Sequence, residues 1–173
     1  MARVVNAAAA PPPLGPDEVR ALGERLRASG AALVLAGGVF DLLHPGHVRY
    51  LAAARALGDS LLVALNGDGS AAALKGPGRP LQGAVARAEI VAALAAVDAV
   101  TIFEEGDLAA VIRRCRPAVV AKGADYDLAR LPAAERDAVA AVGARWAFVG
   151  PPKQESSSAL WARARAGAAG RTR

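Results

Sequence analysis

The chain is poor in cysteine. Among its 173 residues only Cys115 carries a thiol, within the stretch RRCRP. A single cysteine excludes an internal disulfide bond and is typical of proteins from a reducing compartment. We therefore expect an inert thiol and a fold that depends on packing alone.

Long apolar runs are missing as well. Crossing a bilayer takes about 18 consecutive apolar residues, and no segment of the chain approaches that length. The opening residues, MARVVNAAAAPPPLG, lack the basic start and the leucine-rich centre of a signal peptide. These absences predict a cytoplasmic protein with no membrane partner.

Acidic residues are absent from the last eleven positions, which hold four arginines. The formal net charge of +5 falls to +1 without residues 163–173, because the remaining chain has 17 basic and 16 acidic residues. The positive charge therefore belongs mostly to a tail, and no aromatic residue alternates with these arginines to stack on a base. We expect a solvated, disordered basic tail at 167–173 and no nucleic-acid partner.

Aromatic residues make up only 4% of the chain, whereas apolar residues of all types make up 54%. Alanine, valine and leucine must then fill the core, and their small side chains let helices pack closely on a sheet. The length suits one core and is too short for two independent domains. We expect a single domain over 16–166, with its core at 32–162, after a flexible Ala/Pro-rich lead-in at 1–15.

Short apolar runs alternate with helical patterns along the chain. The predicted strands are 32–36, 60–65, 98–103, 117–121 and 145–149. The predicted helices are 16–29, 46–57, 84–96, 107–115, 132–142 and 157–166. Continuously apolar strands indicate burial on both faces, hence a parallel sheet covered by helices. The pattern predicts a doubly wound α/β domain whose ligands bind beyond the carboxyl ends of the strands.

Both histidines lie in LAGGVFDLLHPGHVRYL, residues 35–51, after the first predicted strand. Gly37 and Gly38 let the backbone approach a ligand closely, and the free N–H groups where the next helix begins form an anion site. His44 and His47 are three positions apart and project from one helix face toward that anion. There they can bind a phosphoryl group and the charge that builds during its transfer.

Other roles for this segment remain open. One histidine could cap the helix while the other packs in the core, and a zinc site would need Asp41 as a third ligand. A nucleophilic triad is disfavoured, because no serine or cysteine near a histidine lies in a nucleophile-elbow context. A dinucleotide site is disfavoured because AGGVFD lacks the G-x-G-x-x-G spacing, although Asp59 follows Gly37 at about the 20-residue distance of a ribose-binding acid.

The pattern G-x-F-D-x-x-H-x-G-H resembles the signature of the HxGH nucleotidyltransferases, in the cytidylyltransferase-like superfamily. The residues that match it are Gly38, Phe40, Asp41, His44, Gly46 and His47. Three further segments, ARALGDSLLVALNGDGSAAALKGPGRPL, ARAEIVAALAAVDAVTIFEE and RPAVVAKGADY, follow in order. They are similar to the adenylyltransferase domain that makes ADP-heptose from D-glycero-β-D-manno-heptose 1-phosphate and ATP. The resemblance extends over residues 32–162.

The resemblance implies a Rossmann-like sheet of five parallel strands and the transfer of AMP from ATP to a heptose 1-phosphate. It implies that both histidines, Lys75 and Arg87 act on the phosphates, and the chemistry implies Mg²⁺ carried by the triphosphate rather than by a dedicated metal site. The residues expected to bind the nucleotide or its phosphates are Gly37, Gly38, Val39, Phe40, Asp41, Gly46, Lys122, Gly123, Ser157 and Ser158. Those expected near the acceptor are Asn66, Asp68, Arg79, Asp125 and Tyr126.

Ordinary structural roles compete with several of these assignments. Solvated surface positions would explain Lys75 and Arg79, and an ion pair with Glu89 or another acid would explain Arg87. Turn, cap and packing roles would explain Asn66, Asp68, Asp125, Tyr126 and the serines at 156–158.

The sequence departs from the family pattern in two places. Ala86 stands where an acid commonly precedes the arginine, and PPKQESSS before the last predicted helix lacks the usual glycine. These departures affect base and sugar specificity more than the chemistry. A cytidylyltransferase acting with CTP on glycerol phosphate, a phosphonate or another phosphate acceptor therefore stays open, as does a non-catalytic nucleotide-binding subunit. The resemblance further implies a homodimer, and we expect any sugar kinase of the pathway to be a separate chain.

Overall fold

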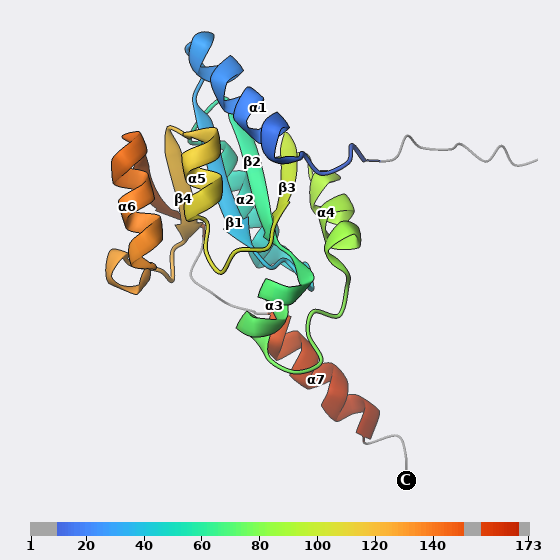
Figure 1. Cartoon of the computed structure of the whole chain (residues 1–173). Helices are drawn as coiled ribbons and strands as arrows, with labels where there is room; N and C mark the ends of the chain where they lie inside the picture. Colours follow the sequence, from blue (N-terminus) through green and yellow to red (C-terminus); the bar gives the residue numbers. More distant parts are fainter. Residues whose placement is uncertain (1–9, 151–156, 170–173) are drawn as a thin grey trace, which may run out of the picture.

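The computed structural model describes residues 10–150 and 157–169 (Figure 1). Its elements in chain order are α1 Pro16–Ala28, β1 Leu33–Gly38, α2 Pro45–Arg55, β2 Ser60–Asn66, α3 Asp68–Lys75, α4 Ala84–Ala92, β3 Ala99–Phe103, α5 Ala109–Cys115, β4 Val119–Gly123, a 3₁₀ turn Leu128–Arg130, α6 Ala133–Val142, β5 Arg145–Val149 and α7 Ser157–Ala169. Within these ranges no helix has the length and the apolar character needed to span a membrane.

The five strands form one parallel sheet in the order β3-β2-β1-β4-β5, which confirms the predicted doubly wound fold. Strand β1 lies in the middle, where Leu35 pairs with Leu62 of β2 on one side and with Val120 of β4 on the other. The strand order reverses direction at β1. In an open α/β sheet a ligand binds at such a point, beyond the carboxyl ends of the strands.

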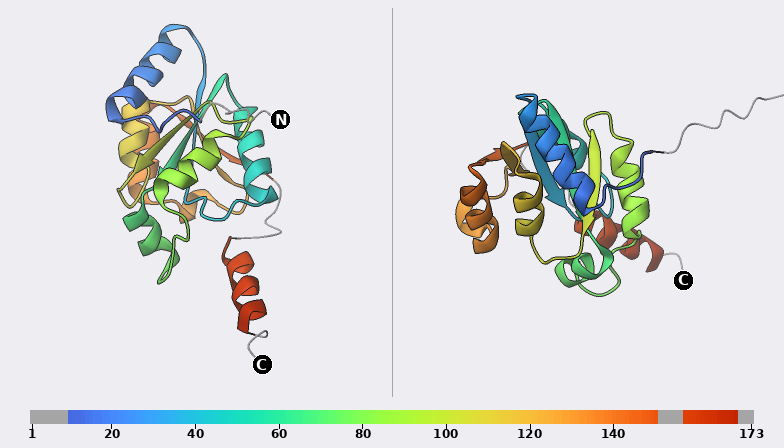
Figure 2. Two further views of the ribbon diagram at one scale, coloured as in Figure 1. Left: turned by 90° about the vertical axis from the view of Figure 1, so that its right-hand side faces the viewer. Right: turned by 45° about the horizontal axis from the view of Figure 1, so that its top comes forward.

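Both faces of the sheet are buried. Leu33 and Leu35 of β1 lie in a core with residues of α1, α5 and α6, whereas Val34 and Ala36 lie in a second core with residues of α2 and α4. Figures 1 and 2 show these two sets of helices on opposite sides of the sheet. Successive side chains of a strand point to opposite faces, so two covered faces require every position to be apolar.

Helix α3 was not predicted from the sequence. The segment NGDGS consists of turn-forming residues, yet Asn66 ends β2, Gly67 precedes the helix and Asp68 begins it. A carboxylate in the first turn complements the helix dipole, and the following AAALK run has high helix propensity. The opposite difference occurs in α4, which ends at Ala92 rather than at residue 96. The fold thus places a short helix directly after β2, at the edge where the site is expected.

The edge of β3 is covered by the segment before α1. The Leu14 N–H donates to the Val100 carbonyl over 2.7 Å, and the Leu14 carbonyl accepts from Thr101 Oγ1 over 2.8 Å. At the other end of the chain, α7 projects beyond the carboxyl ends of the strands (Figure 1) and continues to Ala169. Residues 1–9 of the expected lead-in and 170–173 of the expected tail lie outside the described residues.

Candidate functional site

A cavity of about 630 Å³ opens beyond the carboxyl ends of β1 and β4, where the strand order reverses. The predicted site residues that line it are Gly37, Gly38, Val39, Phe40, His44, Gly46, His47, Asn66, Lys75, Lys122, Gly123, Asp125, Tyr126 and Ser157. Those outside its lining are Asp41, Asp68, Arg79, Arg87 and Ser158. The structure therefore brings both histidines and the two predicted lysines, Lys75 and Lys122, to one cavity and separates a group of charged residues from it.

His44 caps helix α2 and lines the cavity at the same time. Its backbone is extended (φ −144°, ψ 166°), and its Nδ1 accepts a hydrogen bond from the Gly46 N–H over 3.1 Å. Because Nδ1 accepts, the neutral ring carries its proton on Nε2 and can donate from that atom. The capping role left open by the sequence thus fixes the tautomer of His44.

His47 lies in the first turn of α2 beside His44. The ring centroids of His44 and His47 are 3.9 Å apart with an interplanar angle of 31°. The His47 ring also contacts Phe40, with centroids 5.2 Å apart. Phe40 has a positive φ of 50°, which is uncommon for a bulky residue and is typical of tightly determined functional loops. The two imidazoles are therefore held as a pair against a shaped backbone turn.

Close packing accounts for two of the motif glycines. A Cβ at Gly37 would lie 2.5 Å from the Leu108 side chain, and a Cβ at Gly46 would lie 2.8 Å from the His44 ring. Either contact would displace a residue that lines the cavity. The glycines thus keep room for the histidine cap and for the start of α5, in addition to any approach of a ligand.

Lys122 reaches the cavity from the end of β4 and is held by an acid that sequence reasoning missed. Its Nζ lies 2.8 Å from Oε2 of Glu135, whose side chain is only 4% exposed, and 5.9 Å from the Tyr126 ring centroid. The other oxygen, Oε1, accepts from the Leu108 N–H over 3.0 Å at the start of α5. Glu135 belongs to no motif and is 13 residues from Lys122, so only the three-dimensional structure reveals the pair.

Two further residues anchor the walls of the cavity. Tyr50, also absent from the predicted set, donates from its hydroxyl to the Ala121 carbonyl over 2.8 Å, and burial raises the pKa of Tyr50 above its ordinary value. It therefore stays a neutral donor that ties α2 to β4. Ser157 at the start of α7 donates to the Leu42 carbonyl over 3.2 Å and is buried, whereas Ser158 is exposed. Ser156 and the rest of the PPKQES stretch lie outside the described residues.

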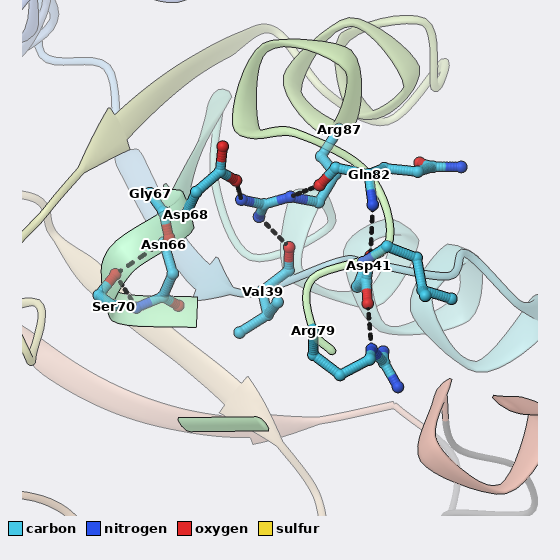
Figure 3. A network of polar contacts seen from close by, with 10 residues as sticks. Val39, Asp41, Asn66, Gly67, Asp68, Ser70, Arg79, Gln82 and Arg87 are labelled. Atoms are coloured by element: carbon cyan, nitrogen blue, oxygen red, sulfur yellow. Dashed lines mark hydrogen bonds and ion pairs between the residues drawn. The ribbon is translucent and has the colours of Figure 1, made fainter. Parts of the chain in front are cut away.

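The predicted residues outside the cavity lining belong mainly to a polar network beside it (Figure 3). Arg87 is fully buried and pairs with Asp68 rather than with Glu89, and Arg79 is buried against Asp41 rather than solvated. Lys75, at the end of α3, is exposed and lines the cavity. Among the described residues no three His, Cys, Asp or Glu side chains lie close enough together to hold a metal ion.

Comparison with known proteins agrees with this geometry. Residues 35–145 match the family model described as Cytidylyltransferase-like. The bifunctional protein HldE of Rhodopseudomonas palustris is 45% identical over 157 residues, which cover 89% of this chain and 31% of that protein. HldE of Streptomyces coelicolor is 43% identical over 152 residues, or 88% of this chain and 32% of that protein. The chain therefore spans only 31–32% of the length of these two relatives.

A solved structure is similar as well. The crystal structure of the lipopolysaccharide core biosynthesis protein from Thermoplasma volcanium superposes with a TM-score of 0.60 at 27% identity and covers 71% of this chain and 100% of that chain. The matched segment contains most of β1, the histidine pair and the neighbouring strands β2 and β4. The chain belongs to the cytidylyltransferase-like family.

Proposed function

We propose that this chain is a nucleotidyltransferase that transfers AMP from ATP to a heptose 1-phosphate, giving an ADP-sugar and pyrophosphate. The observation that carries the proposal is the pair of imidazoles 3.9 Å apart in the cavity at the switch point of the sheet. The HldE relatives, which match 88–89% of this chain, support it. The resemblance of the LKGPGRP and KGADY segments to the ADP-heptose-forming domain supports the choice of sugar.

In the proposed reaction an oxygen of the sugar 1-phosphate attacks the α-phosphorus of ATP in line with the leaving group. A new P–O bond forms, the bond from the α-phosphorus to the bridging oxygen breaks, and pyrophosphate leaves with the electron pair. A phosphate monoester has a second pKa near 6, so the nucleophile is already largely dianionic at neutral pH and needs no general base. Catalysis then depends on positioning and on neutralising charge.

The described residues can supply both the positioning and the charge neutralisation. Nε2 of His44 is the proton-bearing nitrogen of the neutral ring, and together with His47 it would donate to the phosphoryl oxygens on which negative charge builds. Lys75 would reach the phosphates from α3, and Lys122 from the end of β4. Mg²⁺ would enter as part of the substrate, bound mainly by triphosphate oxygens and water, since Mg²⁺ usually keeps several waters and takes few protein ligands.

The test is a pyrophosphate-release assay with Mg²⁺ across ATP, CTP, GTP and UTP. Each nucleotide is paired with a heptose 1-phosphate, a hexose 1-phosphate and glycerol 3-phosphate. Turnover with ATP and the heptose alone is the expected result. Turnover only with CTP and glycerol phosphate would replace the substrates while keeping the chemistry. Nucleotide binding without turnover on any acceptor would contradict the proposal and favour a non-catalytic subunit.

A further inference from the structure

A polar network with buried charges at its centre joins four segments next to the cavity (Figure 3). These are the turn after β1, the start of α3, the loop of residues 76–83, and α4. The network includes Arg87 and Asp41, which are 0% and 1% exposed. Both residues were expected at the phosphates, and neither lines the cavity.

Arg87 uses all three nitrogens of its guanidinium within the protein. Nε donates to the Gln82 carbonyl over 2.9 Å, Nη1 to the Val39 carbonyl over 2.6 Å, and Nη2 to Asp68 Oδ1 over 2.8 Å. One planar cation thus joins the end of β1, the 76–83 loop and the first residue of α3. Its complete burial places the positive charge inside the network and away from the cavity surface.

Asp41 holds the same loop from the other side. It accepts hydrogen bonds from the Leu81 N–H over 2.8 Å and the Gln82 N–H over 3.1 Å, and it forms an ion pair with Arg79. Gln82 is therefore fixed at both its N–H, by Asp41, and its carbonyl, by Arg87. Buried partners of this kind are costly to remove, because the remaining group loses both water and its hydrogen bond.

The residues that the network holds lie on either side of two parts of the site. Val39 and Asp41 stand on either side of Phe40, whose ring contacts His47 and whose φ is positive. Asp68 begins α3 and Gln82 lies in the loop that follows it, so the anchors also stand on either side of Lys75, the last residue of α3. The network is thus the physical link between the histidine turn and the helix that carries Lys75.

We propose that Arg87 and Asp41 are positioning residues that set the distance of Lys75 from the histidine pair, and that Arg87 does not contact the triphosphate. The proposal rests on the proposed function, in which both groups act on one phosphate chain. Positioning errors of about 1 Å can lower turnover by about 10²-fold. Loss of the network should therefore lower kcat although no substrate contact is removed.

Conservative substitutions separate positioning from charge. Arg87→Lys keeps the positive charge, but an ammonium lacks the planar fork that serves three acceptors in different directions. We expect Arg87→Lys to lower kcat by about 10- to 100-fold, nearly as much as Arg87→Gln, with a smaller change in the KM for ATP. A lysine that restores kcat to within about twofold of the parent value would overturn the proposal and assign a charge contact to Arg87.

Asp68 gives an independent variant, because its side chain is 56% exposed and its substitution should not prevent folding. Asp68→Asn retains an oxygen acceptor for Nη2 and should lower kcat much less than Asp68→Ala does. If Arg87 instead served the triphosphate, removing the carboxylate charge would free it, and Asp68→Asn would lower the KM for ATP severalfold. That decrease would contradict the proposal. Arg55→Lys, at an ion pair with Asp98 outside the cavity lining, is the matched control and should leave kcat unchanged.

A second readout does not depend on turnover. Amide hydrogen exchange at Leu81 and Gln82, the two donors to Asp41, is measured in the full chain before and after Asp41→Ala, which removes their acceptor oxygen. Faster exchange there, with protection of the sheet amides kept, is expected, and unchanged exchange would show that Asp41 does not hold the loop. An inactive parent chain would refute the proposed function, while the exchange experiment would still decide whether the network orders the loop.

Discussion

The two walls of the cavity are built in different ways. On the histidine wall, His44 takes its position from a local cap on Gly46, and His47 follows three residues later on the same helix. On the lysine wall, Lys122 at the end of β4 is held by Glu135, which comes from helix α6 and also accepts from the N–H at the start of α5. One wall is therefore encoded in a short stretch of sequence, whereas the other exists only after the whole sheet has formed.

This difference shows which interactions can be preserved when a residue is substituted. A local cap needs only an acceptor at one position, so another capping residue can replace it. A buried ion pair between two elements leaves an unpaired charge when either partner is removed. Substitutions on the histidine wall should therefore affect chemistry far more than folding, and those on the lysine wall should affect both.

The largest effect is expected from His47→Ala. This change removes a donor to the phosphoryl oxygens and should lower kcat by about 10²-fold or more, as loss of one transition-state donor does elsewhere. The variant keeps the backbone N–H of residue 47, which donates to the His44 carbonyl over 2.9 Å, so the start of α2 is retained and the melting temperature should change little. Pyrophosphate release and thermal unfolding are measured together, with Val48→Ala, an exposed position on the same helix, as control. Near-parental turnover in a folded His47→Ala variant would remove the histidine from the mechanism.

His44 allows the cap to be separated from the chemistry. His44→Asn keeps an acceptor for the Gly46 N–H and should preserve stability, whereas His44→Ala should cost about 1 kcal/mol of unfolding free energy. Both variants lack the Nε2 donor, so both should lose about 10²-fold in kcat. Urea unfolding and pyrophosphate release test the two properties separately. An active His44→Asn variant would mean that capping is the whole role of His44.

Sequence alone was informative where the residues that act together lie close to one another in the chain. The parallel sheet followed from continuous apolar runs, and the histidine wall from the H-x-G-H spacing at the end of a strand. Glu135 could not be predicted, because no local pattern links it to Lys122. The burial of Arg87 could not be predicted either, since an arginine on a helix has many available partners and only packing shows which of them it contacts. Helix α3 was missed because its first residues are turn formers and its apolar pattern is short.

The lysine wall is tested by Glu135→Gln. The amide keeps an oxygen that can accept from the Leu108 N–H, but the ion pair to Lys122 is lost. A buried lysine without its counter-charge should destabilise the fold by roughly 1–3 kcal/mol and lower kcat/KM by about tenfold. Glu135→Ala also removes the cap of α5 and should be less stable still. Equal stability of the two variants would show that the hydrogen bond from the Leu108 N–H contributes nothing to stability.

Cys115 lies in the core formed by α1, α5 and α6, outside the cavity lining, and should show the smallest functional effect. Burial raises the pKa of the Cys115 thiol to about 12 from its ordinary value of 9.0. The folded protein should therefore resist alkylation at pH 8, and Cys115→Ala should leave kcat unchanged. Because the unfolded thiol ionises first, the thiol's contribution to stability is complete below pH 9 and is lost as the pH rises toward 12. Titrating the unfolding free energy over this range, in the parent chain and in Cys115→Ala, measures that contribution. A parent chain that loses no more stability than the variant would mean that the thiol is less buried than the structure places it.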